Sequence, residues 1–378
     1  MFVAMFVASL IVVIMFHEFG HYATAKLFGM KVEKFFLGFG PTLWSVRRGE
    51  TEYGVKAIPA GGFVKILGMS QYEEVDPADA GRTFHEQAAW KRAIVLAAGS
   101  ATHFLVAVVL LFCALAFVGL PSASNVVDFV TDDSPAQRAG LQQGDAIVAV
   151  DGVATSDFES VRELVTARGG ATIPLVVDRD GSRTELSVTV AEETPDGERQ
   201  GFLGVAPTAV NQRLPAGEAL VGTVAGDFSV VELTRLTFRG LAEVFSPTGL
   251  SNWLGSIGDQ GPRDASGPVS LVGIGQVVNA AGAAGDVFAV LGLLANLNIV
   301  LGILNILPLP PLDGGHLAVL GVEQSVNGVR RLRGKRPTWR LDPSVVTPVA
   351  LAVILFFVVL SLTALYVDIT KPASELIQ

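Results

Sequence analysis

Four long apolar stretches constrain the fold of this chain more than any other feature of its sequence. They cover residues 1–28, 93–120, 287–312 and 345–367. A membrane-spanning helix needs roughly 20 mostly apolar residues, and each stretch is long enough. Half of the residues are hydrophobic and only 17% are charged, against about 25% in soluble proteins. The sequence therefore predicts a polytopic α-helical membrane protein with four transmembrane helices.

The first stretch has an alternative interpretation as a signal peptide. It lacks basic residues before its apolar core and a clean small-residue cleavage site after it. It also carries His17, Glu18 and His21, which are costly residues to place in a segment that is discarded. We therefore expect a retained transmembrane helix.

The distribution of basic residues predicts how the helices are oriented. Residues 315–344, between the third and fourth stretches, contain an excess of arginine and lysine: Arg330, Arg331, Arg333, Lys335, Arg336 and Arg340. Short loops with such an excess lie in the cytoplasm. Four spans then place both termini and residues 121–286 outside, and residues 29–92 in the cytoplasm or against the inner membrane face.

The outer segment is expected to begin with a small globular unit. Residues 145–150 and 174–178 are short apolar runs that end near Asp-Gly turns and predict strands, and residues 157–167 between them predict a helix. Within 207–286, apolar residues recur at helical spacing over 214–247 and predict an amphipathic helix on the outer membrane surface. Residues 251–267 are rich in Gly, Ser and Asp and predict a loop.

Charge and cysteine content exclude several kinds of partner and site. A formal net charge of −9 argues against a nucleic-acid partner, because phosphate binding needs a surplus of Lys and Arg on one face. Cys113 is the single cysteine. It cannot form an intrachain disulfide, and multi-cysteine zinc sites are excluded.

The first apolar stretch contains a metal-binding pattern, His17-Glu-Phe-Gly-His21. Residues i and i+4 share one face of a helix, so both imidazoles can reach one metal ion, and Glu18 can accept a proton from water. Ionisable residues deep in a spanning helix cost roughly 2.5–3.5 kcal/mol each on insertion scales. A metal ion compensates this cost, and a chance match in an apolar helix is disfavoured.

Two histidines need a third ligand, because catalytic zinc has three protein ligands and one open position. Asp313 follows the third apolar stretch, where Pro308, Pro310 and Pro311 break the helix. The predicted topology places Asp313 at a membrane depth similar to that of His17 and His21. His316 is the rival ligand, and His85 and His103 are weaker alternatives.

These residues resemble the site-2 protease family of intramembrane zinc metalloproteases, in its bacterial form with a PDZ domain. The resemblance rests on His17–His21, on Asn305 through Asp313-Gly-Gly-His316, and on three Gly-rich segments: 38–41, 61–65 and 267–275. It covers most of the chain. It implies that His17, His21 and Asp313 bind Zn²⁺ and that Glu18 is the catalytic base.

The resemblance also implies how a substrate is held. Asn305 is expected to bind the substrate backbone or the oxyanion, and its alternative role is a polar helix breaker. Residues 52–66 resemble the family's membrane-associated β-hairpin, and Gly61, Gly62 and Phe63 are expected to pair with an unwound substrate by strand addition.

Residues 122–206 resemble a single PDZ domain, with a typical run at 134–152 and a closing strand at 201–205. Its groove is expected to bind a peptide C-terminus or to act only as a steric filter. One departure is His103, where the family often has Asn. This exchange is not expected to touch the catalytic set, although helix packing or the access of substrate would change.

The expected function is therefore intramembrane proteolysis in a bacterial inner (plasma) membrane. The implied substrates are single-span membrane proteins, for example anti-sigma factors or remnant signal peptides. Two other classes of function are alternatives: an inactive scaffold that uses its PDZ domain, and a metal or ion transporter. Intact site residues disfavour the scaffold. The lack of paired hydrophobic repeats disfavours the transporter.

Overall fold

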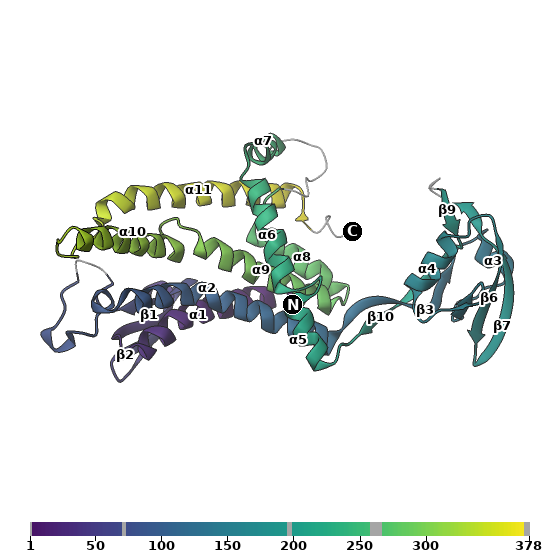
Figure 1. The fold of residues 1–378 in the computed structure, drawn as a ribbon, viewed down its shortest axis with the longest axis horizontal. Coiled ribbons are helices and arrows are strands. Elements are labelled where there is room, and N and C mark those ends of the chain that lie inside the picture. The colour runs from purple at the N-terminus through teal and green to yellow at the C-terminus, as the bar shows by residue number, and fades with distance from the viewer. Residues whose placement is uncertain (1, 70–72, 195–198, 258–266, 374–378) are drawn as a thin grey trace. The chain divides into compact units, whose positions relative to one another are not determined.

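The computed structural model describes residues 2–69, 73–194, 199–257 and 267–373. The chain forms two compact units, one from residues 1–115 with 215–378 and one from residues 116–214. Figure 1 shows the elements of both units by label and colour.

The four predicted transmembrane helices are confirmed as helices long and apolar enough to cross a membrane. They are α1 (Phe2–Leu27), α2 (Ala89–Cys113, continued by a π-helical turn, η3, Ala114–Val118), α9 (Val287–Ile306) and α11 (Pro343–Thr370). Helix α2 packs against both α1 and α9. Small side chains such as Ala107 and Ala295 are fully buried at the α2–α9 contact, which lets these helices approach closely. Helix α2 is therefore the central element of the first unit.

The third helix ends earlier than predicted. Helix α9 stops at Ile306 because Leu307 is extended and prolines follow. The segment 315–344, expected as a basic loop, is mostly helical, since α10 runs over Asp313–Leu332. Packing explains why this segment is helical. Leu317 and Leu320 of α10 pack into a core with Leu96 of α2, and burying an apolar helical face stabilises the helix.

The sheet beside α1 is larger than the hairpin expected over residues 52–66. Its strands are β1 (Val32–Arg48) and β2 (Thr51–Ile66). Both strands bend, so residues 34–37 pair with 52–55 on one side and with 62–65 on the other. Gly38 lies at the bend of β1 with φ +85°, a backbone conformation that favours glycine. Residues 62–66 form an outer segment of this sheet. Two short 3₁₀ helices, η1 (Pro77–Asp79) and η2 (Phe84–Glu86), follow.

The second unit is a small antiparallel β domain with its own core. Its main path of strands is β10-β3-β4-β6-β7. The strands and helices are β3 (Leu120–Val130), α3 (Pro135–Ala139), β4 (Ala146–Val150), β5 (Val153–Ala154), α4 (Phe158–Thr166), β6 (Thr172–Arg179), β7 (Ser182–Thr189), β8 (Ala191–Glu193), β9 (Arg199–Phe202) and β10 (Val205–Gln212). The predicted strands at 145–150 and 174–178 and the helix at 157–167 are confirmed. The single closing strand expected at 201–205 is wrong, because β9 ends at Phe202 and β10 begins at Val205.

Residues 215–286 of the first unit contain more helices than predicted. They are α5 (Ala216–Ala225), α6 (Val230–Val244), α7 (Pro247–Ser256) and α8 (Leu271–Ala283). The single helix expected over 214–247 is two, because Ser229 caps a new helix by accepting a hydrogen bond from the Glu232 N–H. The loop expected at 251–267 begins inside α7, and residues 258–266 lie outside the described residues. Val221 of α5 and Val231 of α6 are exposed, which agrees with the apolar face expected for a helix on the membrane surface.

Candidate metal centre

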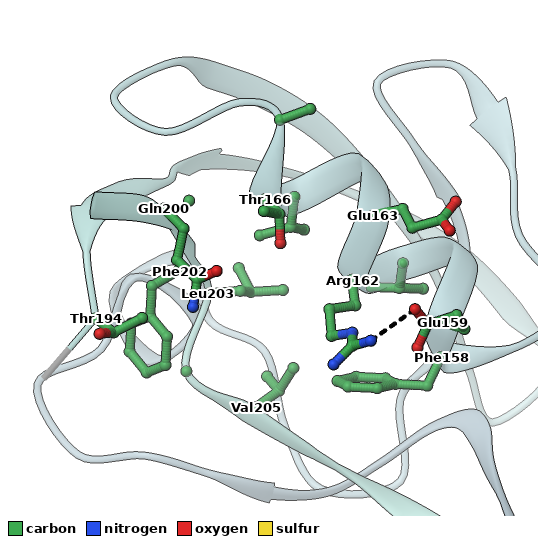
Figure 2. Close-up of a pocket in the computed structure, with 15 residues that line it drawn as sticks. Phe158, Glu159, Arg162, Glu163, Thr166, Thr194, Gln200, Phe202, Leu203 and Val205 are labelled. Carbon is green, nitrogen blue, oxygen red and sulfur yellow. Dashed lines mark hydrogen bonds and ion pairs between the residues drawn. The ribbon is translucent and has the colours of Figure 1, made fainter. Parts of the chain in front are cut away.

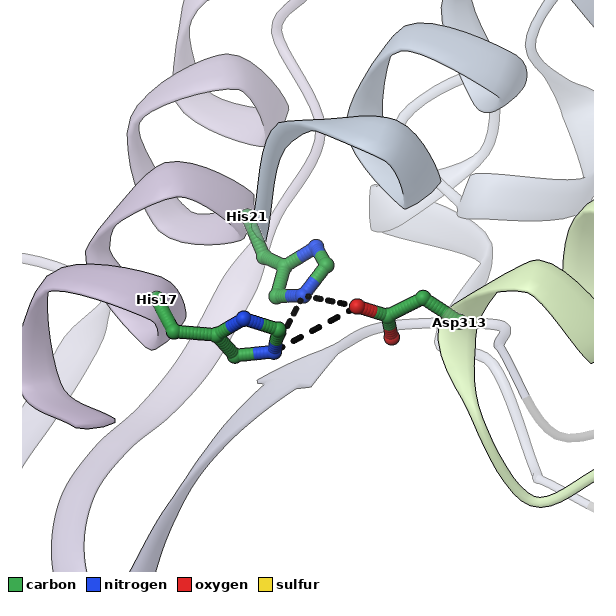
Figure 3. Close-up of side chains that lie close together, drawn as sticks. All are labelled: His17, His21 and Asp313. Carbon is green, nitrogen blue, oxygen red and sulfur yellow. Dashed lines mark hydrogen bonds and ion pairs between the residues drawn. The ribbon is translucent and has the colours of Figure 1, made fainter. Parts of the chain in front are cut away.

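Three side chains from two distant parts of the chain meet beside α2. His17 and His21 lie one turn apart on α1, and Asp313 is the first residue of α10. The Nε2 atoms of the two histidines are 3.3 Å apart. Each Nε2 atom also lies 3.3 Å from Oδ2 of Asp313. Figure 3 shows the three groups pointing at one another.

This triangle has the dimensions of a zinc site. Zinc binds nitrogen and oxygen ligands at about 2.0–2.1 Å in a tetrahedron, so two of its ligand atoms lie about 3.3–3.4 Å apart. Oδ2 of Asp313 is buried and receives no hydrogen bond from the described residues, which is costly unless a cation pairs with it. The donor set and its spacing therefore fit a zinc ion with one open position.

Helix α2 orients the histidines. Nδ1 of His21 lies 2.7 Å from the carbonyl oxygen of Val95, and this contact is satisfied when Nδ1 carries the proton. Nε2 is then free to bind metal. Gly99 lies one turn further along α2. A methyl group at Gly99 would lie 2.3 Å from Nε2 of His21 and 2.5 Å from Cε1 of His17, so the site requires glycine there.

A tight reversal after α9 returns the chain to the histidines. A methyl group on Gly314 would lie 2.1 Å from the carbonyl oxygen of Ile306, and one on Gly315 would lie 2.5 Å from the nitrogen of Pro310. Only glycine therefore lets the start of α10 approach the end of α9 so closely. This approach places Asp313 opposite α1.

Glu18 lies against the outer segment of the sheet. A methyl group on Gly62 would lie 3.0 Å from Cγ of Glu18, and the backbone of Val64 contacts the Glu18 carboxylate. The described residues place no further strand along residues 62–66. Gly61, Gly62 and Phe63 are half-buried, so this strand edge lies next to the general-base candidate.

The other candidate residues are not part of the triangle. Asn305 is half-buried in the last turn of α9. His316 is exposed and is outside the ligand group. His85 hydrogen-bonds with the Met69 carbonyl, 3.1 Å away. The structure thus brings Asp313 to the histidines, and not His316 or His85.

The expectation that His103 does not touch the catalytic set is wrong. Its ring centroid lies 5.1 Å from that of His17. The reason is the position of α2 between α1 and α9. Val95, Gly99 and His103 are spaced by four residues, so they share the α2 face that meets the metal-binding histidines. The sequence interpretation also missed Val95 and Gly99, although a glycine inside an apolar helix is a signal of close packing.

A cavity lies within the small β domain. It measures about 650 Å³ and runs between α4 and residues 200–205. Figure 2 shows its lining, with the Phe158, Phe202 and Leu203 side chains forming apolar walls and Arg162 paired with Glu159 at one side. The shape and lining suit an extended peptide with apolar side chains.

Comparison with known proteins gives the family. The sequence matches the description of peptidase family M50 over residues 5–340. The chain belongs to peptidase family M50. This membership confirms the resemblance to site-2 proteases and makes the protein a membrane metalloprotease.

Curated relatives agree over nearly the whole chain. The zinc metalloprotease Rip1 of Mycobacterium tuberculosis is 35% identical, and the alignment covers 98% of this chain and 97% of the relative. Rip1 of Mycolicibacterium smegmatis is 34% identical, with 98% of each chain covered. The ion in these names, zinc, is the ion that fits the triangle. A solved PDZ domain of an SdrC-like protein from Listeria monocytogenes matches 25% of this chain and 90% of its own, at 21% identity and a TM-score of 0.19.

Proposed function

We propose that this M50 protease hydrolyses peptide bonds within or near the transmembrane segment of single-span membrane proteins. The supporting observation is the triangle of His17, His21 and Asp313, with 3.3 Å between its ligand atoms. Its two histidines lie on a helix that is apolar enough to span a membrane. The substrates would be membrane proteins already shortened outside the membrane, such as anti-sigma factors or remnant signal peptides. The protease would then act in regulated intramembrane proteolysis.

The site residues divide the chemical work. His17, His21 and Asp313 hold Zn²⁺, which when bound polarises a carbonyl group and makes water more acidic. Glu18 accepts the proton of the attacking water and passes it to the leaving amine. The carboxamide of Asn305 donates hydrogen bonds to a substrate carbonyl or to the developing oxyanion.

The strand edge at Gly61–Phe63 receives the unwound substrate. A helical substrate hides its peptide bonds in its own hydrogen-bond ladder, so they must be exposed before hydrolysis. Pairing with a free strand edge supplies replacement hydrogen bonds. Because Gly62 lies against Glu18, a segment paired with this edge would pass close to the base.

Residues 122–206, within the unit 116–214, act as a PDZ domain. Its groove between α4 and residues 200–205 suits the C-terminus of a shortened substrate, or the domain excludes substrates that still carry a folded outer part. The positive residues between Arg330 and Arg340 support a cytoplasmic segment 315–344. The PDZ domain and both termini would then lie outside a bacterial inner (plasma) membrane, with the metal site near the cytoplasmic side.

Co-expression tests the proposed activity. The partner is a tagged single-span protein without its outer domain, and its size is measured on a gel. The enzyme arms are wild type, Glu18→Ala and Asp313→Ala, and a control substrate keeps its folded outer domain. We expect wild type alone to shorten the truncated substrate and to spare the control.

The outcomes separate the possible errors. Cleavage by the Asp313→Ala variant would show that Asp313 is not a required ligand, and His316 would become the candidate for the third ligand. Identical results for wild type and Glu18→Ala across several substrates would favour the inactive scaffold. Equal cleavage of the truncated and control substrates would remove the filter role of the PDZ domain.

A further inference from the structure

His103 lies in the interior of the first unit beside the metal-binding residues. Its side chain is on α2 and only 3% of the residue is exposed. Its ring packs against that of His17, with 5.1 Å between the ring centroids. The metal-ligand group contains His17, His21 and Asp313 but not His103. A polar ring is therefore buried next to the reaction site without a role in the ligand triangle.

Asn298 determines which nitrogen of His103 carries the proton. The Nδ2 atom of Asn298 donates to the Leu294 carbonyl at 2.8 Å. The opposite amide orientation would bring two oxygens to that distance, so it is excluded. Oδ1 of Asn298 thus faces Nδ1 of His103 at 3.3 Å and accepts its N–H. In a neutral imidazole the other nitrogen, Nε2, is then a hydrogen-bond acceptor.

The hydrogen bond that His103 makes among the described residues uses Nδ1. Its Nε2 is not among the fully enclosed unpaired atoms, so this atom borders an opening although the residue is buried. An acceptor in an apolar interior is disfavoured without a partner, so an accessible Nε2 at this place suits a donor that arrives from elsewhere. An unwound peptide at membrane depth brings backbone N–H groups, which need acceptors because lipid supplies none. The chemistry of Nε2 matches this need.

Helix α9 places this acceptor beside a donor. A methyl group on Gly302 would lie 3.2 Å from Cβ of His103, so His103 packs against this point of α9. Asn298, Gly302 and Asn305 are spaced by four and three residues and share one helical face. The carboxamide donors of Asn305 and the acceptor of His103 therefore lie along the same side of α9.

We propose that His103 is a substrate-positioning residue. Its Nε2 atom accepts a hydrogen bond from a backbone N–H of the unwound substrate next to the scissile bond, and Asn298 holds the ring in the required tautomer. Asn305 holds a carbonyl of the same segment. This inference rests on the proposed function, since it needs a peptide in the site.

An ester scan tests the hydrogen bond directly. The probe is a synthetic single-span peptide that wild type cleaves in detergent micelles, with each amide near the mapped cleavage point replaced in turn by an ester, which lacks the N–H. Binding to zinc-loaded Glu18→Gln protein is measured by fluorescence anisotropy, with and without His103→Phe. With His103, we expect one ester to weaken binding about 2- to 10-fold, the effect of one hydrogen bond.

In His103→Phe, the amide peptide should bind weaker by a similar factor, and the ester at that position should cause no further loss. Zinc content should not change. An identical ester profile with His103 and with Phe would overturn the proposal, because a merely structural histidine would change stability and not the profile. Loss of zinc from His103→Phe would overturn it as well, since His103 would then be a ligand.

A second variant protects the test against a folding defect. Asn298→Leu suits an apolar helix and removes the group that fixes the tautomer, so the same ester effect should shrink. If the ester weakens binding to Asn298→Leu as much as it weakens binding to the protein with Asn298, the proposed role of Asn298 is wrong. Failure of wild type to cleave any single-span peptide would instead reject the proposed function itself, before the scan begins.

Discussion

The backbone carbonyl of Val95 on α2 lies 2.7 Å from Nδ1 of His21 on α1. This contact means that a neighbouring helix, and not the HExxH helix itself, sets the orientation of a metal ligand. The packing of α1 against α2 is therefore a condition for metal binding.

Replacing Glu18 with Gln should separate metal binding from catalysis. The amide cannot accept the proton of the attacking water, so cleavage of a single-span substrate should fall by at least about 10²-fold. The zinc content of the purified protein, measured by atomic absorption, should stay near one ion per chain, because the ligand triangle is intact.

Asp313→Ala is the matched comparison for that experiment. It should lose both zinc and activity, because only two of the three protein ligands, His17 and His21, remain. A Glu18→Gln protein without zinc would show that Glu18 is itself a ligand. Removing the ion from wild type with a chelator should reproduce the loss seen with Asp313→Ala, and added zinc should restore activity.

Replacing Gly99 with Ala should disrupt the site without touching a ligand. The new methyl group would meet both imidazoles, at 2.3 Å and 2.5 Å, and the rings would have to move. Displacing the supporting shell of a metal site typically weakens its affinity about 10- to 100-fold. We expect that loss in a competition titration with a zinc-binding dye.

Gly292→Ala is the control, because it is also in an apolar helix and a methyl group there meets no atom within 4 Å. It should keep full zinc affinity, and helix stability should gain by up to about 1 kcal/mol. Equal losses in the two variants would mean that added helix volume, rather than contact with the imidazoles, causes the effect.

Substitutions of Arg92 and Glu323 should have strongly non-additive effects on the free energy of unfolding. Their side chains are only 9% and 7% exposed and lie 3.2 Å apart, and they join α2 to α10, the helix that begins with Asp313. Arg92→Met leaves a buried carboxylate without its cation and should lower the free energy of unfolding by about 3–5 kcal/mol. Denaturation in micelles by a chemical denaturant measures this change.

The double variant Arg92→Met, Glu323→Met should recover most of the lost stability, because it removes both buried charges and keeps apolar volume. If the two single losses simply add in the double variant, the pair is not coupled and the packing of each side chain determines the stability.

The small β domain should lose stability in acid through Asp145. Burial raises the pKa of this carboxyl. The ion pair with Arg179 at 2.7 Å and the hydrogen bond from the Gln142 N–H lower the pKa by more than burial raises it, so the pKa of folded Asp145 lies below its ordinary value. This stabilisation is therefore complete above the unfolded pKa of about 3.9 and is lost as pH falls through the folded pKa.

Asp145→Asn should lower the free energy of unfolding of a fragment covering residues 116–214 by about 1–3 kcal/mol at pH 7. The difference from wild type should shrink below about pH 4. Glu159→Gln is the matched control, because its pair with Arg162 is exposed on both sides and exposed pairs contribute little to stability. A difference that is constant from pH 7 to pH 3 would rule out the ionic origin.

The sequence by itself determined the membrane character and the chemistry. Apolar runs of about 20 residues have few alternatives to a spanning helix, because lipid leaves no other way to satisfy the backbone. The i, i+4 spacing of His17 and His21 is likewise a local property of one helix, so the pair could be assigned before any fold was known.

Only the tertiary structure decided which distant groups join that pair. Asp313 and His316 are three residues apart, and the reversal at Gly314 and Gly315 selects Asp313. The position of α2 between α1 and α9 brings His103 against His17, which the sequence interpretation did not foresee. The pairing of β1 with both parts of β2 is also non-local. These features depend on contacts between residues far apart in the chain, and local spacing carries no information about them.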